Sequence, residues 1–166
     1  MNIFYDNNTG FETDFASNDF VRELVEKTCE VLGCPYEVSV SVSVVDEDEI
    51  HRLNNEFRDI DRATDVLSFP MNEFDEAGVF DGDAFEASLT TDPDTDELML
   101  GDVIICAQKV KAQAEEYGHS EKREFAFLVV HSLLHLCGFD HIEDSDRLVM
   151  ESKQKEILDL LGINRF

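Results

Sequence analysis

The stretch that decides the architecture of this chain is HSLLHLCGFDH, residues 131–141. His131 and His135 are four residues apart, so on an α-helix they share one face and lie about 6 Å apart along the axis. Gly138 permits a left-handed turn that ends such a helix and reverses the chain. We therefore predict a helix with two histidines near its end, followed by a turn that brings His141 to the same point.

Three of the chain's five histidines lie in this stretch, which favours one shared metal ion over three separate packing roles. Neutral imidazoles bind zinc at about 2.0–2.1 Å, and three protein nitrogens with a fourth position open are typical of catalytic zinc. Water bound at such a site has its pKa lowered to about 7. His131, His135 and His141 are therefore the predicted ligands of Zn²⁺, with Ni²⁺ and Cu²⁺ as alternatives because imidazole also accepts them.

The residues around the three histidines have simpler interpretations. Cys137 lies off the face that the first two histidines share, so it is predicted to pack in the core. Asp140 is predicted to steady a ligand through a hydrogen bond. His51 and His119 have no comparable neighbours in the sequence and are predicted to be ordinary surface residues.

The rest of the chain alternates strand and helix patterns. Valines at 38, 40, 42 and 44 alternate with serines, which predicts a strand with one buried and one polar face near a sheet edge. A helix is predicted from a cap at Ser17 or Asn18 to Gly33. Further strands are predicted at 2–5, 65–69 and 98–106, the last with a bulge at Gly101, and further helices at 46–57, 107–117, 121–137 and 144–161.

These elements predict an α+β fold with a single small mixed β-sheet of about four strands, packed with about five helices, the metal-site helix being central. The chain has 166 residues, a length typical of one domain. We therefore expect one domain over residues 1–166, with an acidic loop at about 72–97. That loop is predicted to be a solvated or partly disordered excursion with a short hairpin around Asp81-Gly82.

Charge restricts the possible partners. The chain has 13 Lys and Arg against 38 Asp and Glu, a net charge of −25, and residues 73–97 contain ten acidic and no basic side chains. Such a protein does not bind a phosphate backbone through a broad basic face. No apolar run approaches the ~20 residues of a membrane helix, and no signal-peptide pattern is present. We expect a cytoplasmic protein whose four cysteines are buried free thiols.

The histidine stretch resembles the signature of the YbeY family of bacterial metal-dependent endoribonucleases. A second stretch agrees with it: the family has an Arg followed by Thr-Asp-Val-Leu-Ser-Phe-Pro, and this chain has Arg58 and then TDVLSFP at 64–70. GDVII at 101–105 matches the family's strand before the later helices. Resemblance runs from about His51 to the C-terminus, except for the acidic loop. The departures are Ser132, where Gly is usual, and Phe139, where Tyr is common.

The resemblance implies single-strand-specific, zinc-dependent endoribonuclease activity in small-subunit rRNA 3′-end maturation and ribosome quality control. It implies catalytic roles for Arg58 and His131, with single-stranded rRNA and the ribosome or a ribosome-associated protein as partners. A guanidinium can bind two oxygens of the charged transition state in a fork. Without the resemblance, Arg58 would be assigned to a surface salt bridge with Asp59, Asp61 or Glu56. Asp65 is a partner of the metal site, a general base or a strand-start cap.

Two other functions fit parts of the sequence. The histidine spacing is similar to that of metzincin metalloproteases, but Ser132 stands where those enzymes have the Glu that activates water. A metal-stabilised, ribosome-associated factor with little intrinsic catalysis would fit the net charge of −25, because intrinsic RNA affinity should then be poor.

Overall fold

The computed structural model describes residues 1–11 and 15–163. Within that part of the chain, one mixed sheet of four strands is packed with six helices. The strands are β1 (Asn2–Asn7), β2 (Val38–Val45), β3 (Val66–Pro70) and β4 (Leu98–Cys106). The helices are α1 (Asn18–Leu32), α2 (Glu47–Arg58), α3 (Asp83–Ser88), α4 (Ala107–Tyr117), α5 (Glu121–Leu136) and α6 (Asp144–Leu160). The predicted α+β class and four-stranded mixed sheet are confirmed, and α3 is an addition to the predicted helices.

The sheet has the order β1-β2-β4-β3, in which β1, β2 and β4 are parallel and β3 is antiparallel to β4. β2 lies between two strands, so the prediction that it runs near a sheet edge is wrong. The alternation of valine and serine reports which face of a strand is covered, and it carries no information on the strand's neighbours. The predicted bulge in β4 is present, because Ser39 pairs with Met99 while Val40 pairs with Gly101.

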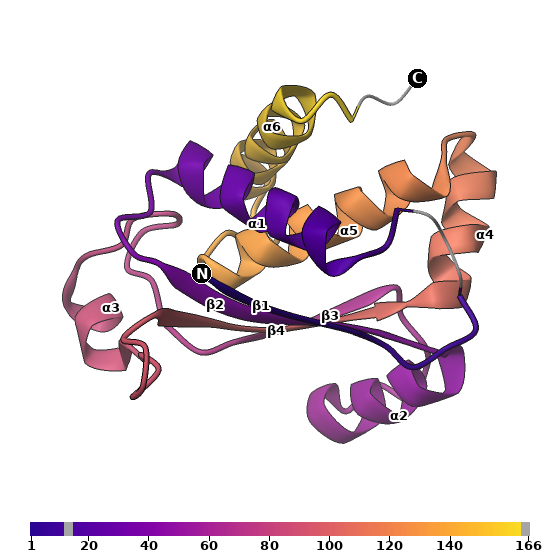
Figure 1. Ribbon diagram of the computed structural model, residues 1–166, viewed down its shortest axis with the longest axis horizontal. Coiled ribbons are helices and arrows are strands. Elements are labelled where there is room, and N and C mark those ends of the chain that lie inside the picture. The colour runs from indigo at the N-terminus through magenta and orange to yellow at the C-terminus, as the bar shows by residue number, and fades with distance from the viewer. Residues whose placement is uncertain (12–14, 164–166) are drawn as a thin grey trace.

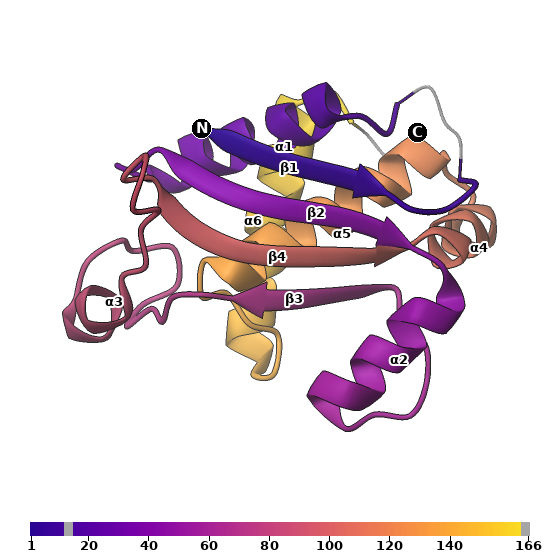
Figure 2. The same ribbon diagram turned by 60° about the horizontal axis from the view of Figure 1, so that its bottom comes forward.

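The helices cover the two faces of the sheet unequally. α1, α5 and α6 lie over one face and α2 lies on the other, as Figure 1 shows edge-on and Figure 2 shows from the α2 side. α5 is central, since it packs against α1, α4, α6, β3 and β4. Val129, Leu133 and Leu134 of α5 are fully buried, and each such side chain contributes about 1.5–3 kcal/mol through burial. The metal-site helix is therefore held rigidly from several sides.

The helix starts follow the capping residues in the sequence. Ser17 accepts a hydrogen bond from the backbone N–H of Phe20 at 3.2 Å, and Ser120 accepts one from Arg123 at 3.0 Å. Both bonds satisfy donors that the first turn of a helix leaves without partners. Every helix in the described part of the chain is too short or too polar to cross a membrane.

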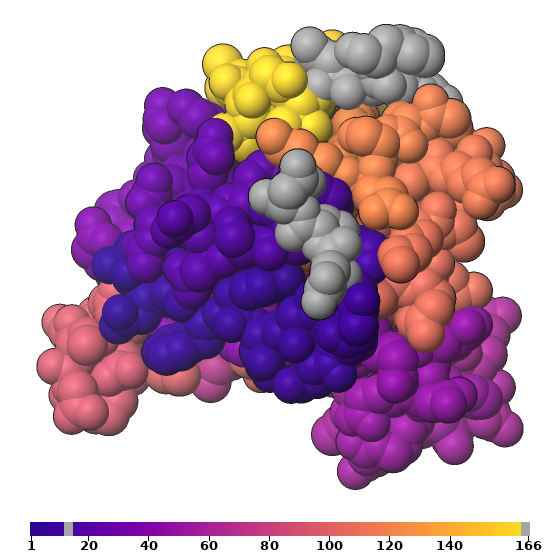
Figure 3. Space-filling model, turned by 45° about the vertical axis from the view of Figure 1, so that its right-hand side comes forward, coloured from indigo at the N-terminus to yellow at the C-terminus, as the bar shows by residue number. Residues whose placement is uncertain are grey.

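The acidic segment, residues 72–97, differs from its prediction. It is not a solvated excursion, because Phe85 of α3 is fully buried and its ring packs against those of Phe74 and Phe80 at centroid distances of 5.1 and 6.0 Å. These aromatic side chains give an otherwise acidic segment one apolar side. The segment forms a lobe at one edge of the molecule, pink in Figure 3, at the opposite end from α2.

The predicted hairpin at Asp81-Gly82 is also wrong. Gly82 directly precedes α3, and the Asp75 carboxylate accepts hydrogen bonds from the backbone N–H groups of Ala84 and Phe85 at the start of that helix. The chain reverses later in the segment, where an isolated antiparallel bridge joins Thr91 to Leu98. The four cysteines are free thiols, as expected, although only Cys106 and Cys137 are buried while Cys29 and Cys34 are partly exposed.

Candidate metal centre

The three predicted ligands converge at the end of α5. The Nε2 atoms of His131 and His135 are 3.2 Å apart. The ring of His141 lies 5.6 Å from that of His131 and 5.0 Å from that of His135, measured between centroids. One ring nitrogen of each residue lies within 4.8 Å of the others. The helix spacing and the turn thus place three imidazoles around one point.

The turn after α5 also determines which nitrogen of His135 faces that point. Nδ1 of His135 lies 2.9 Å from the backbone carbonyl oxygen of Phe139. Because a carbonyl only accepts hydrogen bonds, Nδ1 must carry the proton and Nε2 keeps its lone pair. Gly138, with φ of 92°, makes this turn possible.

The electrostatics favour neutral imidazoles. Burial lowers the pKa of His131 to about 4, and the neighbouring His135 acts in the same direction. Burial also lowers the pKa of His135, while its hydrogen bond to the Phe139 carbonyl opposes the shift. Metal ions bind the neutral form of histidine, so these side chains are ready to bind an ion at neutral pH.

The donor set fits a divalent transition-metal ion. In the described part of the chain, these three histidines are the group of potential ligands close enough to share an ion. Three nitrogen donors suit zinc, nickel or copper better than calcium or magnesium, which prefer oxygen. The structure therefore brings together all three residues that the sequence predicted as ligands.

The acidic segment holds the ligand-bearing turn in place, a contact that sequence reasoning missed. The backbone N–H of Gly78 donates a hydrogen bond of 2.9 Å to the carbonyl of Cys137, the last residue before Gly138. A Cβ atom at Gly138 would lie 2.6 Å from Cβ of Phe74. The phenylalanines of the segment indicate that one side of it is apolar. They do not indicate that this side packs on the turn at Gly138, because that turn is about 60 residues further along the chain.

Gly138→Ala is expected to lower the free energy of unfolding by about 1–3 kcal/mol and to weaken metal binding as well. The reason is twofold: alanine disfavours the positive φ, and its methyl group would collide with Phe74. Chemical denaturation and metal titration measure the two effects. Gly118→Ala is the matched control, since it also has positive φ but an open space for a Cβ atom. Equal loss of metal affinity in both variants would contradict this account.

Arg58 lies beside the histidine cluster, at the end of α2. Its guanidinium donates to the backbone carbonyl of Ser68 and lies 5.3 Å from the ring centroid of Phe69. Ser68 is itself bonded to Ser132, the neighbour of His131 in α5, so the guanidinium lies close to the helix that carries the histidines. Two of the acids proposed as salt-bridge partners of Arg58 pair with other residues: Glu56 pairs with Arg52, and Asp61 pairs with His51.

The two predicted supporting carboxylates make local contacts. Asp65 accepts hydrogen bonds from the backbone N–H of Val66 at 2.8 Å and from Nε2 of Gln113 at 3.3 Å, which is the geometry of a strand-start cap. It still acts on His131 through its charge, which opposes the lowering of that pKa. Asp140 accepts a bond of 2.7 Å from the backbone N–H of His141. Its contact is thus with the main chain of a ligand residue.

Ser132, the departure from the family pattern, is fully buried within α5. Its hydroxyl lies 2.5 Å from that of Ser68 in β3, so the extra polar group is paired. A buried hydroxyl costs little when it is hydrogen-bonded and considerably more when it is not. The bond also joins β3 to α5. The Ser68 carbonyl of the same strand accepts a hydrogen bond from Arg58.

Ser68→Ala is expected to destabilise the fold by about 1–3 kcal/mol, because it leaves the Ser132 hydroxyl buried without its partner. The double variant Ser68→Ala/Ser132→Ala is expected to be more stable than Ser68→Ala alone, since no unpaired hydroxyl remains. Thermal unfolding of both single variants and the double variant gives the coupling free energy. Additive effects would show that the two hydroxyls are energetically independent.

The prediction for His119 is wrong. Its side chain is only 9% exposed, and its Nε2 lies 2.7 Å from Oε2 of Glu124, which is buried too. Burial raises the pKa of Glu124, and the hydrogen bond with His119 opposes that shift. The turn between α4 and α5 folds His119 inward, which its sequence neighbours do not indicate. His51 is 44% exposed, as predicted, and Cys137 is buried in the core.

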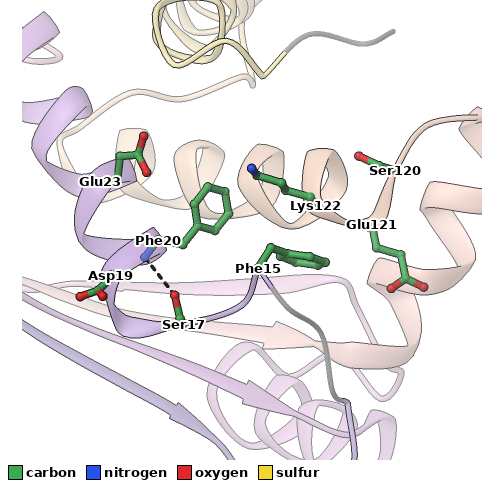
Figure 4. Close-up of a pocket in the computed structure, with 8 residues that line it drawn as sticks. All are labelled: Phe15, Ser17, Asp19, Phe20, Glu23, Ser120, Glu121 and Lys122. Atoms are coloured by element: carbon green, nitrogen blue, oxygen red, sulfur yellow. Dashed lines mark hydrogen bonds between the residues drawn. The ribbon is translucent and has the colours of Figure 1, made fainter.

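Three hollows in the surface show where the histidine cluster is open to solvent and where it is not. One of about 370 Å³ and a smaller one of about 130 Å³ lie along α5 and α6, and the smaller one is lined by His131 and His141. A larger hollow of about 620 Å³ lies elsewhere, between the first turns of α1 and α5 (Figure 4). Phe15 and Phe20 form its apolar part, and the side chains of Asp19, Glu23 and Glu121 surround them. It contains none of the three histidines.

Comparison with known proteins gives a consistent result. A family model described as Endoribonuclease YbeY matches residues 4–162. Proteins named Endoribonuclease YbeY from Lachnoclostridium phytofermentans and Agathobacter rectalis are 45% and 47% identical over 165 residues, which cover 99% of this chain and 100% of each relative. A solution structure of a Thermotoga maritima protein is similar with a TM-score of 0.58 and 29% identity, covering 96% of this chain and 89% of that one.

Proposed function

The chain belongs to the YbeY endoribonuclease family, and on this premise we propose that it cleaves single-stranded RNA at the centre formed by His131, His135 and His141. The observation that carries the proposal is the convergence of three imidazoles, each with a ring nitrogen within 4.8 Å of the others. Arg58 bonds to the strand that meets the histidine-bearing helix. We propose Zn²⁺ as the ion, because three neutral nitrogens with an open position suit catalytic zinc.

When bound, the ion would supply Lewis-acid catalysis at the phosphodiester. The chain's own residues would do the rest. The Phe139 carbonyl holds His135 in one tautomer, and the turn at Gly138 brings His141 to the same point. Arg58 would bind the phosphoryl oxygens, whose negative charge grows as the bond breaks. A guanidinium has five N–H donors, so its bond to the Ser68 carbonyl leaves donors for an anion.

The physiological role we propose is 3′-end maturation of small-subunit rRNA and ribosome quality control in the cytoplasm. A net charge of −25 makes a broad electrostatic grip on RNA unfavourable. We therefore propose that the ribosome or a ribosome-associated protein brings the enzyme to its substrate. Delivery by such a partner would let a protein with an acidic surface act on RNA.

The same charge favours one second candidate: a metal-stabilised ribosome-associated factor with little catalysis of its own. Arg58 discriminates between the two, since a binding factor does not need a guanidinium to stabilise the charge of a transition state. A metalloprotease is a poorer fit. The position that would carry the activating carboxylate is Ser132, which is fully buried and bonded to Ser68.

The test is cleavage of a short single-stranded RNA by metal-loaded protein, with and without a chelator. We expect cleavage that stops on chelation and returns when Zn²⁺ is added back. The ends of the products identify the nucleophile: a 2′,3′-cyclic phosphate with a 5′-OH end indicates attack by the RNA 2′-OH, whereas a 5′-phosphate with a 3′-OH end indicates attack by water. Metal-loaded protein that binds RNA without cutting it would support the binding-factor alternative instead.

A further inference from the structure

A depression between α5 and α6 begins at the metal centre and runs along α5 toward the start of that helix. α5 contributes Arg123, Phe127 and His131, which are four residues apart and so share one face. The hollow of about 130 Å³ beside His131 and His141 and the adjoining hollow of about 370 Å³ share three lining residues, namely Phe127, Glu151 and Gln154. The two hollows therefore form one groove, which extends about 12 Å along α5 from residue 123 to residue 131.

The groove is less acidic than the molecule as a whole. Three cations line it, Arg123, Arg147 and Lys155, against two acids, Glu151 and Asp159. That balance is positive on a chain of net charge −25. Positive charge beside the metal centre favours an anionic ligand that extends beyond the ligating histidines.

Within residues 1–11 and 15–163, two of these cations form surface ion pairs. Arg147 is 50% exposed and lies 3.3 Å from Asp144 and 4.0 Å from Glu151. Lys155 is 79% exposed and lies 2.7 Å from Asp159. Exposed pairs of this kind are weak. An RNA phosphodiester, which carries one negative charge as a carboxylate does, can therefore compete with the carboxylates as partner of either cation.

The wall of the groove is aromatic where it meets the centre. The ring of Phe127 is stacked on that of His131, with 6.1 Å between centroids and 14° between planes. The Arg123 guanidinium lies 5.7 Å from the Phe127 centroid. Nε2 of Gln154 donates to the Phe127 carbonyl at 2.9 Å, which joins the two helices at this point. Aromatic and guanidinium surfaces beside cations are what unpaired bases and their phosphates contact in single-strand binding proteins.

We infer that this α5–α6 groove, lined by Arg123, Phe127, Arg147, Glu151, Gln154 and Lys155, binds single-stranded RNA on one side of the bond that is cleaved. The inference rests on the proposed function and adds the path of the substrate to it. Arg58 donates to the Ser68 carbonyl of β3, and β3 meets α5 at the Ser68–Ser132 bond, whereas the groove opens on His131 and His141 along the α6 side of α5. The strand would thus pass the metal centre between Arg58 and the groove. Duplex RNA fits poorly, since it would need a broad basic face.

The salt dependence of RNA binding tests the groove. We expect Arg147→Gln and Lys155→Gln each to weaken binding of a short, cleavage-resistant 2′-O-methyl phosphorothioate RNA by about threefold to tenfold. Each should also reduce the slope of log Kd against log salt by about 0.7, the value for one lost contact with a single-strand phosphate. A change in folding does not produce that change of slope. Metal content and Tm should stay at wild-type values.

Charge-matched variants outside the groove are the controls. Lys153→Gln removes the same charge from the same helix, but Lys153 does not line either hollow and lies 3.5 Å from Glu156. We expect it to leave the slope unchanged. Glu151→Gln should tighten RNA binding about threefold, because it removes a repulsion inside the groove. Glu156→Gln, which removes an acid outside the groove, should have a smaller effect.

The outcomes separate the two proposals. If the groove variants have the same Kd and salt slope as Lys153→Gln, the groove does not bind the RNA. Cleavage by the wild type would still uphold the proposed function in that case. A wild-type protein that carries its metal and neither binds nor cleaves RNA overturns both. Opposite effects of Lys155→Gln and Glu151→Gln, each beyond its control, support the groove.

Discussion

His131→Ala is expected to abolish RNA cleavage and to weaken metal binding more than roughly 100-fold. Changing a residue that merely supports a ligand commonly costs 10- to 100-fold in metal affinity, and removing a ligand should cost more. His131 also holds the centre of the cluster, since its Nε2 lies 3.2 Å from that of His135 and its ring contacts those of His141 and Phe127. Cleavage should fall to the level of the chelated wild type.

Metal titration and single-turnover cleavage measure these two losses separately. His51→Ala is the control, because His51 is 44% exposed, pairs with Asp61 and is not one of the three histidines that converge. It should keep both properties. If His131→Ala cleaves RNA as fast as the wild type prepared in the same way, the observed activity comes from a contaminant or from another site. Unchanged metal affinity in this variant would contradict the assigned ligand set.

Arg58→Ala should lower kcat about 100- to 1000-fold, the usual cost of losing one donor to a developing negative charge. Its metal affinity should equal that of the wild type, because Arg58 donates to the Ser68 carbonyl and ligates nothing. Arg58→Lys keeps the charge but not the planar fork, so we expect only partial recovery of kcat. Steady-state kinetics with metal content measured on the same samples checks both expectations.

Arg52→Ala is the matched control for Arg58, since Arg52 lies on the same helix and pairs with Glu49 and Glu56 instead. It should cleave RNA at the wild-type rate. A wild-type kcat in Arg58→Ala would remove Arg58 from the mechanism and would favour the ribosome-associated binding factor. Equal loss of kcat in Arg52→Ala and Arg58→Ala would indicate a general charge effect on RNA association.

Much of the fold followed from local patterns. The cap at Ser17, the helix through His131 and His135 and the bulge in β4 near Gly101 all lie where the sequence predicts them. Each depends on residues within about one helical turn or on one strand. Local hydrogen-bond chemistry and side-chain periodicity are sufficient for such features.

The errors share a physical cause, because each depends on contacts between distant segments. β2 has β4 as a neighbour, from about 60 residues further along the chain. His119 is buried because α4 and α5 fold against each other around Glu124. The acidic segment is packed because Phe85 meets an apolar surface built elsewhere. No periodicity within a segment reports on such partners.

The sequence by itself determined which three histidines converge, because the helical repeat and the glycine turn bring His131, His135 and His141 toward one point. Only the tertiary structure decided what surrounds that point: the acidic segment that bonds the turn, Arg58 on the Ser68 carbonyl, the Ser68–Ser132 bond, and the α5–α6 groove. These juxtapositions join separate strands and helices. They arise from packing around a common core, which no local stretch of sequence encodes.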